Sequence, residues 1–411
     1  MRMLKNSSLL LGLMTVGMIS QTISTTDSEI ANFRVTGNNK GFLTYETEIE
    51  IIKEYVIDTI FLPRRIVAED NVPQINSLST WMTDLKKHPR IASLKASEIA
   101  IPGAHHAGLT YLTPYFELLE ALFGSWGLGG LFKEKSDDFL TRIVQSLSVP
   151  QTHSVADILQ MGARYLDLRV TADIDHPDIV YLSHCFLSQI RLNDTLNDIN
   201  NFLLRNPGEI LILDVVVDWD PFGTVGNPVP HPTLEAMIRK YIDPKFILGR
   251  ANASQPISTY GGVFITGFSG NNTLDQVKIK AGWAITQNPY PYNVVSNIKS
   301  YYESGAYIKQ EPTDYDFLKC DPYVTADGEA NVETVVYEAL YEKNPVSLDP
   351  LINAKYIPAN LIASAKLSNS LFYNTVDRSV KLTDVLNIIE MDDFSAEAAI
   401  RAIEINFNRH F

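Results

Sequence analysis

The stretch EILILDVVVDW, residues 209–219, constrains the fold of this chain more than any other feature of its sequence. Asp214 is the one charged residue between Glu209 and Asp218, so the stretch is too apolar for a strand that has one face in water. A strand buried on both faces is typical of a parallel sheet that helices cover on both sides. We therefore expect an α/β fold built around this strand.

Strand-like and helix-like segments alternate along residues 78–411. The predicted strands include EIAIPG, ARYLDLRV and IVYLSH, with GGVFITGF, AGWAIT, LFYNTV and LNIIEMDDF as weaker candidates. The predicted helices are SVADILQMG, LNDTLNDINNFLLR and SAEAAIRAIEINF. This alternation predicts a parallel sheet, and about eight strands favour a (β/α)8 TIM-type barrel, distorted from the regular form.

Two regions precede the predicted barrel. Arg2 and Lys5, followed by the apolar run LLLGLMTVGMI, predict a signal peptide over residues 1–24 and hence a secreted, extracellular protein. This run is too short to span a bilayer as a helix. Residues 27–75 alternate apolar and polar side chains, which predicts a small β-rich N-terminal extension.

Charge and composition exclude some classes of partner. The net charge is −14, which argues against nonspecific nucleic-acid binding because that needs a basic surface. It also argues against broad electrostatic adhesion to anionic membranes. The hydrophobic content of 45% is sufficient for a sizeable core. We expect a globular protein with no nucleic-acid partner.

Polar side chains gather where the predicted strands end. In a barrel of this kind the carboxyl ends of the strands form the active-site face. Any one of these residues alone is more often structural, but together they indicate a functional site. They are His105 and His106 after the first strand, Asp167 and Arg169 near the end of the second, His184 after the third, Asp214 and Asp218 in or after the fourth, and Asp392 and Asp393 after the last.

Four motifs, IPGAHHAG, QTHSVADILQMGARYLDLRV, LSHC and LNDINNFLLRNPGEILILD, follow Trp81 and Met82 in this order. Together they resemble the X domain of phosphatidylinositol-specific phospholipase C, especially the metal-independent bacterial type and its animal relatives. The resemblance covers residues 78–218 and then fades. It implies a barrel fold and a phosphodiesterase that acts on phosphatidylinositol or glycosylphosphatidylinositol-like lipids, with transient contact to a membrane surface.

The resemblance also implies roles for individual side chains. His105 takes the proton from the inositol 2-hydroxyl, and His184 protonates the diacylglycerol oxygen. Arg169 holds the phosphate through its guanidinium group. Calcium-dependent relatives carry an acidic residue at the position of Arg169, two residues after Asp167. A cation at this position repels Ca²⁺, so we expect neither a metal ion nor another cofactor.

Other matches to the family are less direct. The family has a late aspartate that orients the first histidine, and Asp392 is the candidate, with Asp393 or Asp377 as alternatives. We expect His106 to bind the substrate, and it stands where the bacterial enzymes have an aspartate that supports the general acid. A histidine cannot supply a fixed negative charge, so another group must take over this role.

Asp167 and Asp214 are the carboxylates that we expect near His184, where one of them could replace the missing aspartate. Cys185 stands where the family often has glycine. Its thiol is either free or bridged to Cys320, and the sequence leaves both alternatives open. Residues 111–132 are strongly apolar and form either an interfacial lid at the active-site face or part of the core.

Two other functions fit the same sequence. A non-catalytic protein that binds lipid or inositol phosphate on the same barrel is the first, because His106 replaces an acidic residue. A metal-dependent enzyme similar to glycerophosphodiester phosphodiesterases is the second, and Arg169 argues against it.

Overall fold

The computed structural model describes the residues that form the predicted barrel. It covers residues 74–113, 141, 144–146, 148–173, 175–184, 186–218, 228–268, 273–281, 291–305, 315–322, 361–376 and 384–410. All of them belong to one compact unit, residues 41–411. The predicted signal peptide, residues 27–73 of the predicted extension, and residues 114–132 of the apolar segment lie outside the described residues.

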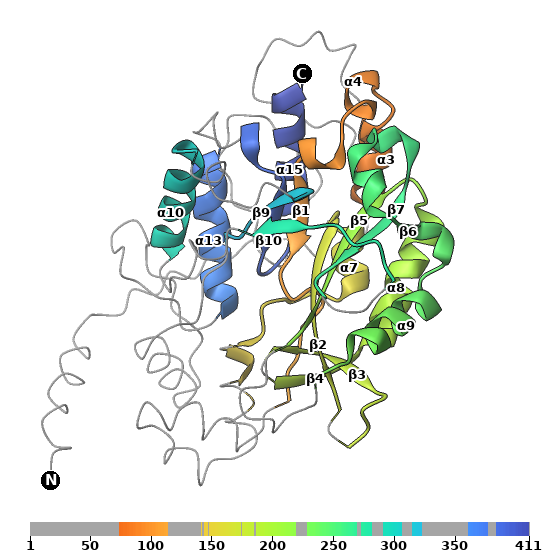
Figure 1. Cartoon of the computed structure of the whole chain (residues 1–411). Helices are drawn as coiled ribbons and strands as arrows, with labels where there is room; N and C mark the ends of the chain where they lie inside the picture. The colour runs from red at the N-terminus through yellow and green to blue at the C-terminus, as the bar shows by residue number, and fades with distance from the viewer. Residues whose placement is uncertain are drawn as a thin grey trace, which may run out of the picture. The chain divides into compact units, whose positions relative to one another are not determined.

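The strands form one sheet in the centre of this unit (Figure 1). They are β1 (Ile101–Ala104), β2 (Tyr165–Ala172), β3 (Val180–His184), β4 (Phe186–Arg191), β5 (Ile210–Val217), β6 (Ile247–Leu248), β7 (Gly262–Thr266), β8 (Ile279–Ala281), β9 (Phe317–Cys320) and β10 (Ile388–Met391). The apolar stretch at residues 209–219 contains β5, whose residues from Ile210 to Leu213 are fully buried.

Parallel pairing connects most of the described strands. The path runs β6-β7-β5-β2-β1-β10-β9-β8, and every neighbouring pair on it is parallel. All carboxyl ends on this path therefore lie at one edge of the sheet. The predicted α/β barrel is confirmed.

Two contacts show that the sheet curls around its interior. The Val277 amide, just before β8, donates a hydrogen bond to the Ile265 carbonyl of β7, so the two ends of the path approach each other. Phe264 of β7 and Phe317 of β9 are not on neighbouring strands of the path, yet their ring centroids lie 5.6 Å apart. Their side chains meet across the barrel interior.

The third predicted strand departs from the regular barrel. β3 pairs antiparallel with β2 and with β4, so β3 and β4 form a hairpin beside the parallel path. The prediction that IVYLSH forms a strand is confirmed, but this strand pairs antiparallel and does not lie on the parallel path of the barrel. Consecutive strands that follow so closely cannot pair in parallel, because a parallel connection needs a crossover of a dozen or more residues. His184 is therefore carried by the hairpin.

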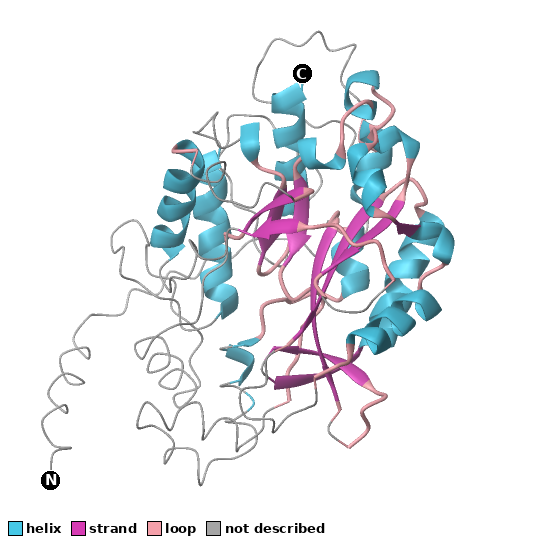
Figure 2. Ribbon diagram, viewed as in Figure 1, coloured by secondary structure: helices cyan, strands magenta, loops and turns pink. Residues whose placement is uncertain are grey.

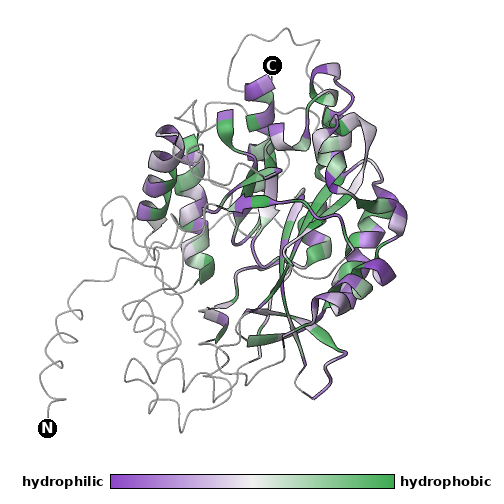
Figure 3. Cartoon of the chain, in the orientation of Figure 1, coloured by the Kyte–Doolittle hydropathy of each residue, from purple (hydrophilic) through white to green (hydrophobic). Residues whose placement is uncertain are grey.

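Helices surround the sheet (Figure 2). In Figure 1, α10 and α13 lie to the left of the strands, and α8 and α9 lie to the right. Green apolar colour is concentrated on the strands and on the inner helix faces in Figure 3. None of the described helices is long and apolar enough to cross a membrane. The helices are α3 (Trp81–Leu85), α4 (Pro89–Ala92), α7 (Val155–Gln160), α8 (Leu192–Arg205), α9 (His231–Tyr241), α10 (Pro291–Glu303), α13 (Leu361–Val376) and α15 (Ala396–His410).

Two weak strand predictions meet different outcomes. The segment LFYNTV is the last part of α13, so that prediction is wrong. Phe372 and Tyr373 favour strands by propensity, but both are buried on a face of this helix, and packing decides the conformation. Of AGWAIT, only Ala281 is described, and it ends β8.

A buried ion pair closes the amino-terminal end of the barrel. Arg164, just before β2, donates to Glu209, just before β5, and both side chains are fully buried. The Arg164 guanidinium also donates to the carbonyls of Leu78 and Ser79. Glu209 accepts from the Thr83 amide on α3. This network attaches the segment before β1 to the amino-terminal end of the barrel.

Candidate active site

The carboxyl ends of β1 and β10 bring His105 and Asp392 together. The two strands are parallel neighbours with Ala104 opposite Met391, so the next residue of each strand lies at the same level. His105 Nδ1 lies 2.7 Å from Asp392 Oδ1. Asp393 instead accepts a hydrogen bond from the Thr152 hydroxyl. The structure thus places Asp392 against His105, whereas Asp377 lies outside the described residues.

The surroundings of this pair favour a neutral imidazole. Burial, together with the positive charges of Arg169, His184 and Lys319, holds the pKa of His105 well below its usual value. Burial also raises the pKa of Asp392, with contributions from Asp393 and Asp167. The imidazole N–H opposes that rise, because it stabilises the carboxylate. At neutral pH, His105 is therefore unprotonated at one ring nitrogen and able to accept a proton.

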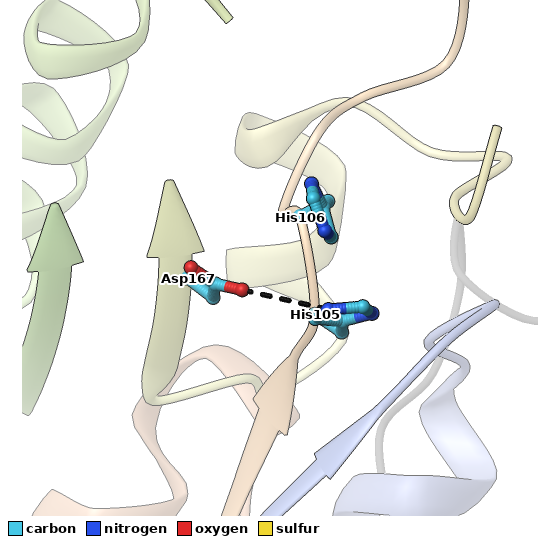
Figure 4. Close-up of side chains that lie close together, drawn as sticks. All are labelled: His105, His106 and Asp167. Atoms are coloured by element: carbon cyan, nitrogen blue, oxygen red, sulfur yellow. Dashed lines mark ion pairs between the residues drawn. The ribbon is translucent and has the colours of Figure 1, made fainter. Parts of the chain in front are cut away.

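Asp167 and Arg169 project from the same face of β2, because residues two apart in a strand share a face. The Arg169 Nε donates to both oxygens of Asp167, at 2.9 and 3.2 Å. Asp167 Oδ2 lies 3.7 Å from His105 Nε2, the contact drawn in Figure 4. Burial alone would raise the pKa of Asp167, but Arg169 and the other nearby positive charges lower it overall.

His106 lies between the two other histidines. Its ring centroid is 4.1 Å from that of His105 and 4.1 Å from that of His184. The backbone of His106 has a φ of 43°, which histidine adopts more readily than most residues. Burial lowers its pKa well below the usual value, and its Nδ1 is buried with no hydrogen-bond partner.

His184 is oriented by the main chain. Its Nδ1 lies 2.8 Å from the Ser148 carbonyl oxygen. A carbonyl oxygen only accepts hydrogen bonds, so Nδ1 carries the proton in this contact. Neither carboxylate expected near His184 makes this contact: Asp167 is bonded to Arg169, and Asp214 accepts from the Tyr165 hydroxyl at 2.6 Å. The sequence could not indicate a backbone acceptor.

The barrel interior below the histidines holds charges that the sequence analysis missed. Lys319 of β9 lies 2.6 Å from Glu390 of β10 and 3.5 Å from Asp321. Burial would lower the pKa of Lys319, but Asp321 and Glu390 raise it, so its ammonium group stays charged. Charged residues inside the short apolar strands FLKC and IIEM were the available signal.

Three side chains of the site offer atoms of the kind that bind metal ions. One atom each from His105, His106 and Asp167 lie within 4.8 Å of one another (Figure 4). The Arg169 guanidinium is bonded to both oxygens of Asp167, and its positive charge opposes a cation at this position. We therefore do not assign a metal to these residues.

Cys320 ends β9 and carries a free, buried thiol. Because this thiol is free, Cys320 forms no disulfide bond with Cys185. Cys185 itself lies outside the described residues. Burial raises the pKa of the Cys320 thiol well above its usual value.

Comparison with known proteins finds a family model that matches part of the chain. Residues 139–221 match the family model of the phosphatidylinositol-specific phospholipase C X domain. The predicted resemblance to the X-domain family is confirmed. The matched residues include Asp167, Arg169, His184 and Asp214 of the site, whereas His105, His106 and Asp392 lie outside the match.

Curated relatives match over part of their length. PI-PLC X domain-containing protein 2 from Homo sapiens is 28% identical over 33% of this chain and 42% of its own length. Variant-surface-glycoprotein phospholipase C from Trypanosoma brucei brucei is 28% identical over 34% of this chain and 38% of its own length. The chain thus spans less than half the length of these relatives.

Solved structures agree with the fold over a longer span. A mutant of the phosphatidylinositol-specific phospholipase C from Staphylococcus aureus superposes with a TM-score of 0.52 at 14% identity. The superposition covers 80% of this chain and 97% of that chain. At this identity the likeness concerns the fold, and it extends well beyond residues 139–221.

Proposed function

We propose that this chain is a phosphodiesterase of the phospholipase C type that cleaves phosphatidylinositol or a glycosylphosphatidylinositol-like lipid. The observation that carries the proposal is the proximity of His105 after β1, Arg169 on β2 and His184 on the β3–β4 hairpin, which are close enough for the charges of Arg169 and His184 to lower the pKa of His105. Two histidines and a guanidinium group supply a base, an acid and a positive charge, which phosphodiester cleavage requires. The X-domain match and the trypanosomal relative named as a phospholipase C support this class of activity.

In the proposed reaction, the inositol 2-hydroxyl attacks phosphorus and gives its proton to His105 Nε2. The bond from phosphorus to the diacylglycerol oxygen breaks, and His184 gives its Nε2 proton to that oxygen. The products are diacylglycerol and a cyclic inositol phosphate. Asp392 at His105 Nδ1 stabilises the imidazolium that forms, since a carboxylate favours the charged ring. Arg169 donates to the phosphoryl oxygens.

The same scheme assigns a function to the neighbours of the site. Asp167 keeps the Arg169 guanidinium in place through two contacts of its Nε. His106 contacts the substrate, where it replaces the aspartate of the bacterial enzymes. Secretion, as the predicted signal peptide over residues 1–24 implies, would bring the enzyme to lipids on cell surfaces.

Phosphatidylinositol vesicles provide the direct test. Incubation with the full chain should produce a cyclic inositol phosphate, which phosphorus NMR detects as a new resonance. Binding to the vesicles without any product would favour the second candidate, a non-catalytic lipid-binding protein. The observation that favours this candidate is His106 in place of an acid, with its Nδ1 buried and unpartnered.

Arg169 should make the reaction independent of metal ions. We expect EDTA to leave the initial rate unchanged, because the guanidinium group supplies the positive charge. Arg169→Ala should lower the rate by about 10²–10³-fold, the usual loss for one charge-stabilising donor. Arg169→Lys should retain only part of the wild-type rate, since a lysine ammonium group lacks the planar arrangement of donors in a guanidinium group. A rate that disappears with EDTA and returns with Ca²⁺ would contradict this prediction.

Restoring the acidic residue at position 106 should alter the pH profile. A carboxylate facing His184 stabilises the protonated acid, so we expect His106→Asp to move the alkaline limb of the rate profile to higher pH. His106→Asn is the matched control, because asparagine has the same shape as aspartate but carries no charge, and it tolerates the φ of 43° at this position. Identical alkaline limbs in the two variants would show that charge at this position is irrelevant.

A further inference from the structure

Residues 148–152, here called the 148–152 segment, contact every element that carries a proposed acid–base group. At one end, the Ser148 carbonyl accepts from His184 Nδ1 at 2.8 Å. At the other end, the Thr152 hydroxyl donates to Asp393, the residue after Asp392. The Pro150 carbonyl accepts from the Asp393 amide at 2.7 Å. The segment therefore connects the β3–β4 hairpin with the carboxyl end of β10.

Gln151 makes the most specific contacts of this segment. Its side-chain Nε2 donates to the His105 carbonyl at 2.7 Å and to the Met391 carbonyl at 3.0 Å. Its Oε1 accepts from the Phe394 amide at 2.9 Å. The residue is fully buried, so both N–H groups and the oxygen of its amide are satisfied within the protein. These three hydrogen bonds hold the side chain in one orientation.

These contacts surround the His105–Asp392 pair. One N–H of Gln151 bonds the main chain of His105 itself, and the other bonds the residue that immediately precedes Asp392. The Phe394 amide, on the far side of Asp392, bonds the same side chain. A shift of β1 against β10 would change the 2.7 Å distance between His105 Nδ1 and Asp392 Oδ1, and Gln151 resists that shift.

We propose that the 148–152 segment is the positioning element of the acid–base site: Gln151 holds His105 against Asp392, and the Ser148 carbonyl holds His184 with its proton on Nδ1. This inference rests on the proposed function and deepens it. It also explains how His184 is oriented although His106 has replaced the acidic residue. A carbonyl fixes the ring and its tautomer without adding a charge, so Nε2 is the nitrogen that exchanges a proton with the substrate.

A second buried amide, Asn387, serves as a control that distinguishes a positioning role of Gln151 from a purely structural one. Asn387, at the amino end of β10, is also a buried amide with all its groups bonded. Its Nδ2 donates to the carbonyls of Ala96 and Ile99, and its Oδ1 accepts from the Leu318 amide. It ties β10 to its neighbours at the opposite end of the strand from His105. Loss of either amide leaves buried main-chain groups unpaired, so both losses destabilise the fold.

The experiment compares Gln151→Met with Asn387→Leu in the full chain. With phosphatidylinositol vesicles as substrate, Gln151→Met should lower kcat on the order of 10²-fold with little change in KM, since small misplacements of catalytic groups have such effects. Asn387→Leu should keep the wild-type kcat per folded molecule. Proton NMR of the resting protein should show the His105 Nδ1–H resonance displaced or lost in Gln151→Met and unchanged in Asn387→Leu.

The NMR arm needs no turnover, so it separates this inference from the proposed function. Wild-type protein that gives no cyclic phosphate refutes the proposed function, while the His105 resonance still tests the positioning role. Nitrogen NMR of wild-type protein, recorded with the His184 ring in its neutral form, should show the Nδ1–H tautomer, the form left after Nε2 has given its proton to the substrate. This measurement remains if Gln151→Met fails to fold. An Nε2–H tautomer, or equal effects of the two substitutions on kcat and on the His105 resonance, would overturn the inference.

Discussion

We expect the replacement of His105 with alanine to lower the proposed turnover of phosphatidylinositol by about 10²–10⁴-fold, because general-base catalysis typically contributes that much. The base must be unprotonated to act. Burial and the neighbouring positive charges depress the pKa of His105, so the wild-type rate should rise with pH along an acidic limb that lies below the usual histidine range. His184→Ala should reduce turnover by a similar factor, through loss of the general acid.

A histidine at the other end of the barrel provides the control. His410, near the C-terminus, contacts the Glu98 carbonyl before β1, on the side of the sheet opposite the site. His410→Ala should keep the wild-type rate, and circular dichroism should show that all three variants are folded. Full turnover in folded His105→Ala or His184→Ala would remove that histidine from the proposed mechanism.

The part of the site that the sequence predicts well follows from parallel strands. His105 and Asp392 each come directly after a strand, and the ends of neighbouring parallel strands meet at one edge. Although 287 positions separate them, strand order places both at the same edge of the sheet, and the family resemblance suggested Asp392 as the residue that orients His105. The proximity of Asp167 and Arg169 is also predictable from the sequence, because side chains two positions apart on one strand lie on the same face of the sheet.

Other parts of the site depend on information that residue types do not carry. His184 was placed at the end of a strand, but its strand turns out to belong to an antiparallel hairpin. Its hydrogen-bond partner is the main-chain carbonyl of Ser148. Every residue has such a carbonyl, so the residue types in the sequence do not indicate which one bonds His184. Lys319 and Glu390 compensate each other inside the barrel, which becomes visible only when β9 and β10 are paired.

The hairpin also shows why the resemblance to a regular barrel was incomplete. The chain from His184 to Phe186 is too short for a crossover, so β3 and β4 pair with each other and leave the parallel path. The strand β6 was overlooked because it has only two residues, Ile247 and Leu248. A pattern of alternating residues cannot establish a strand of that length.

The largest effect on stability is expected at the amino-terminal end of the barrel, where Arg164 and Glu209 pair. Glu209→Gln leaves the buried Arg164 guanidinium without its counter-charge, and breaking a buried pair in this way costs about 3–5 kcal/mol. That cost is a large fraction of the unfolding free energy of an ordinary domain. Urea denaturation followed by circular dichroism should show the loss as a lower midpoint.

The exposed pair of Arg401 and Glu397 on α15 is the matched control for this prediction. Its side chains are 33% and 43% exposed, and its nearest atoms lie 3.7 Å apart. Solvent screens such a pair, so Glu397→Gln should change the unfolding free energy by less than about 1 kcal/mol. Equal midpoints for Glu209→Gln and Glu397→Gln would mean that the Arg164 guanidinium keeps enough support from the carbonyls of Leu78 and Ser79 alone. In that case the Arg164–Glu209 ion pair would not be needed to attach the segment before β1 to the amino-terminal end of the barrel.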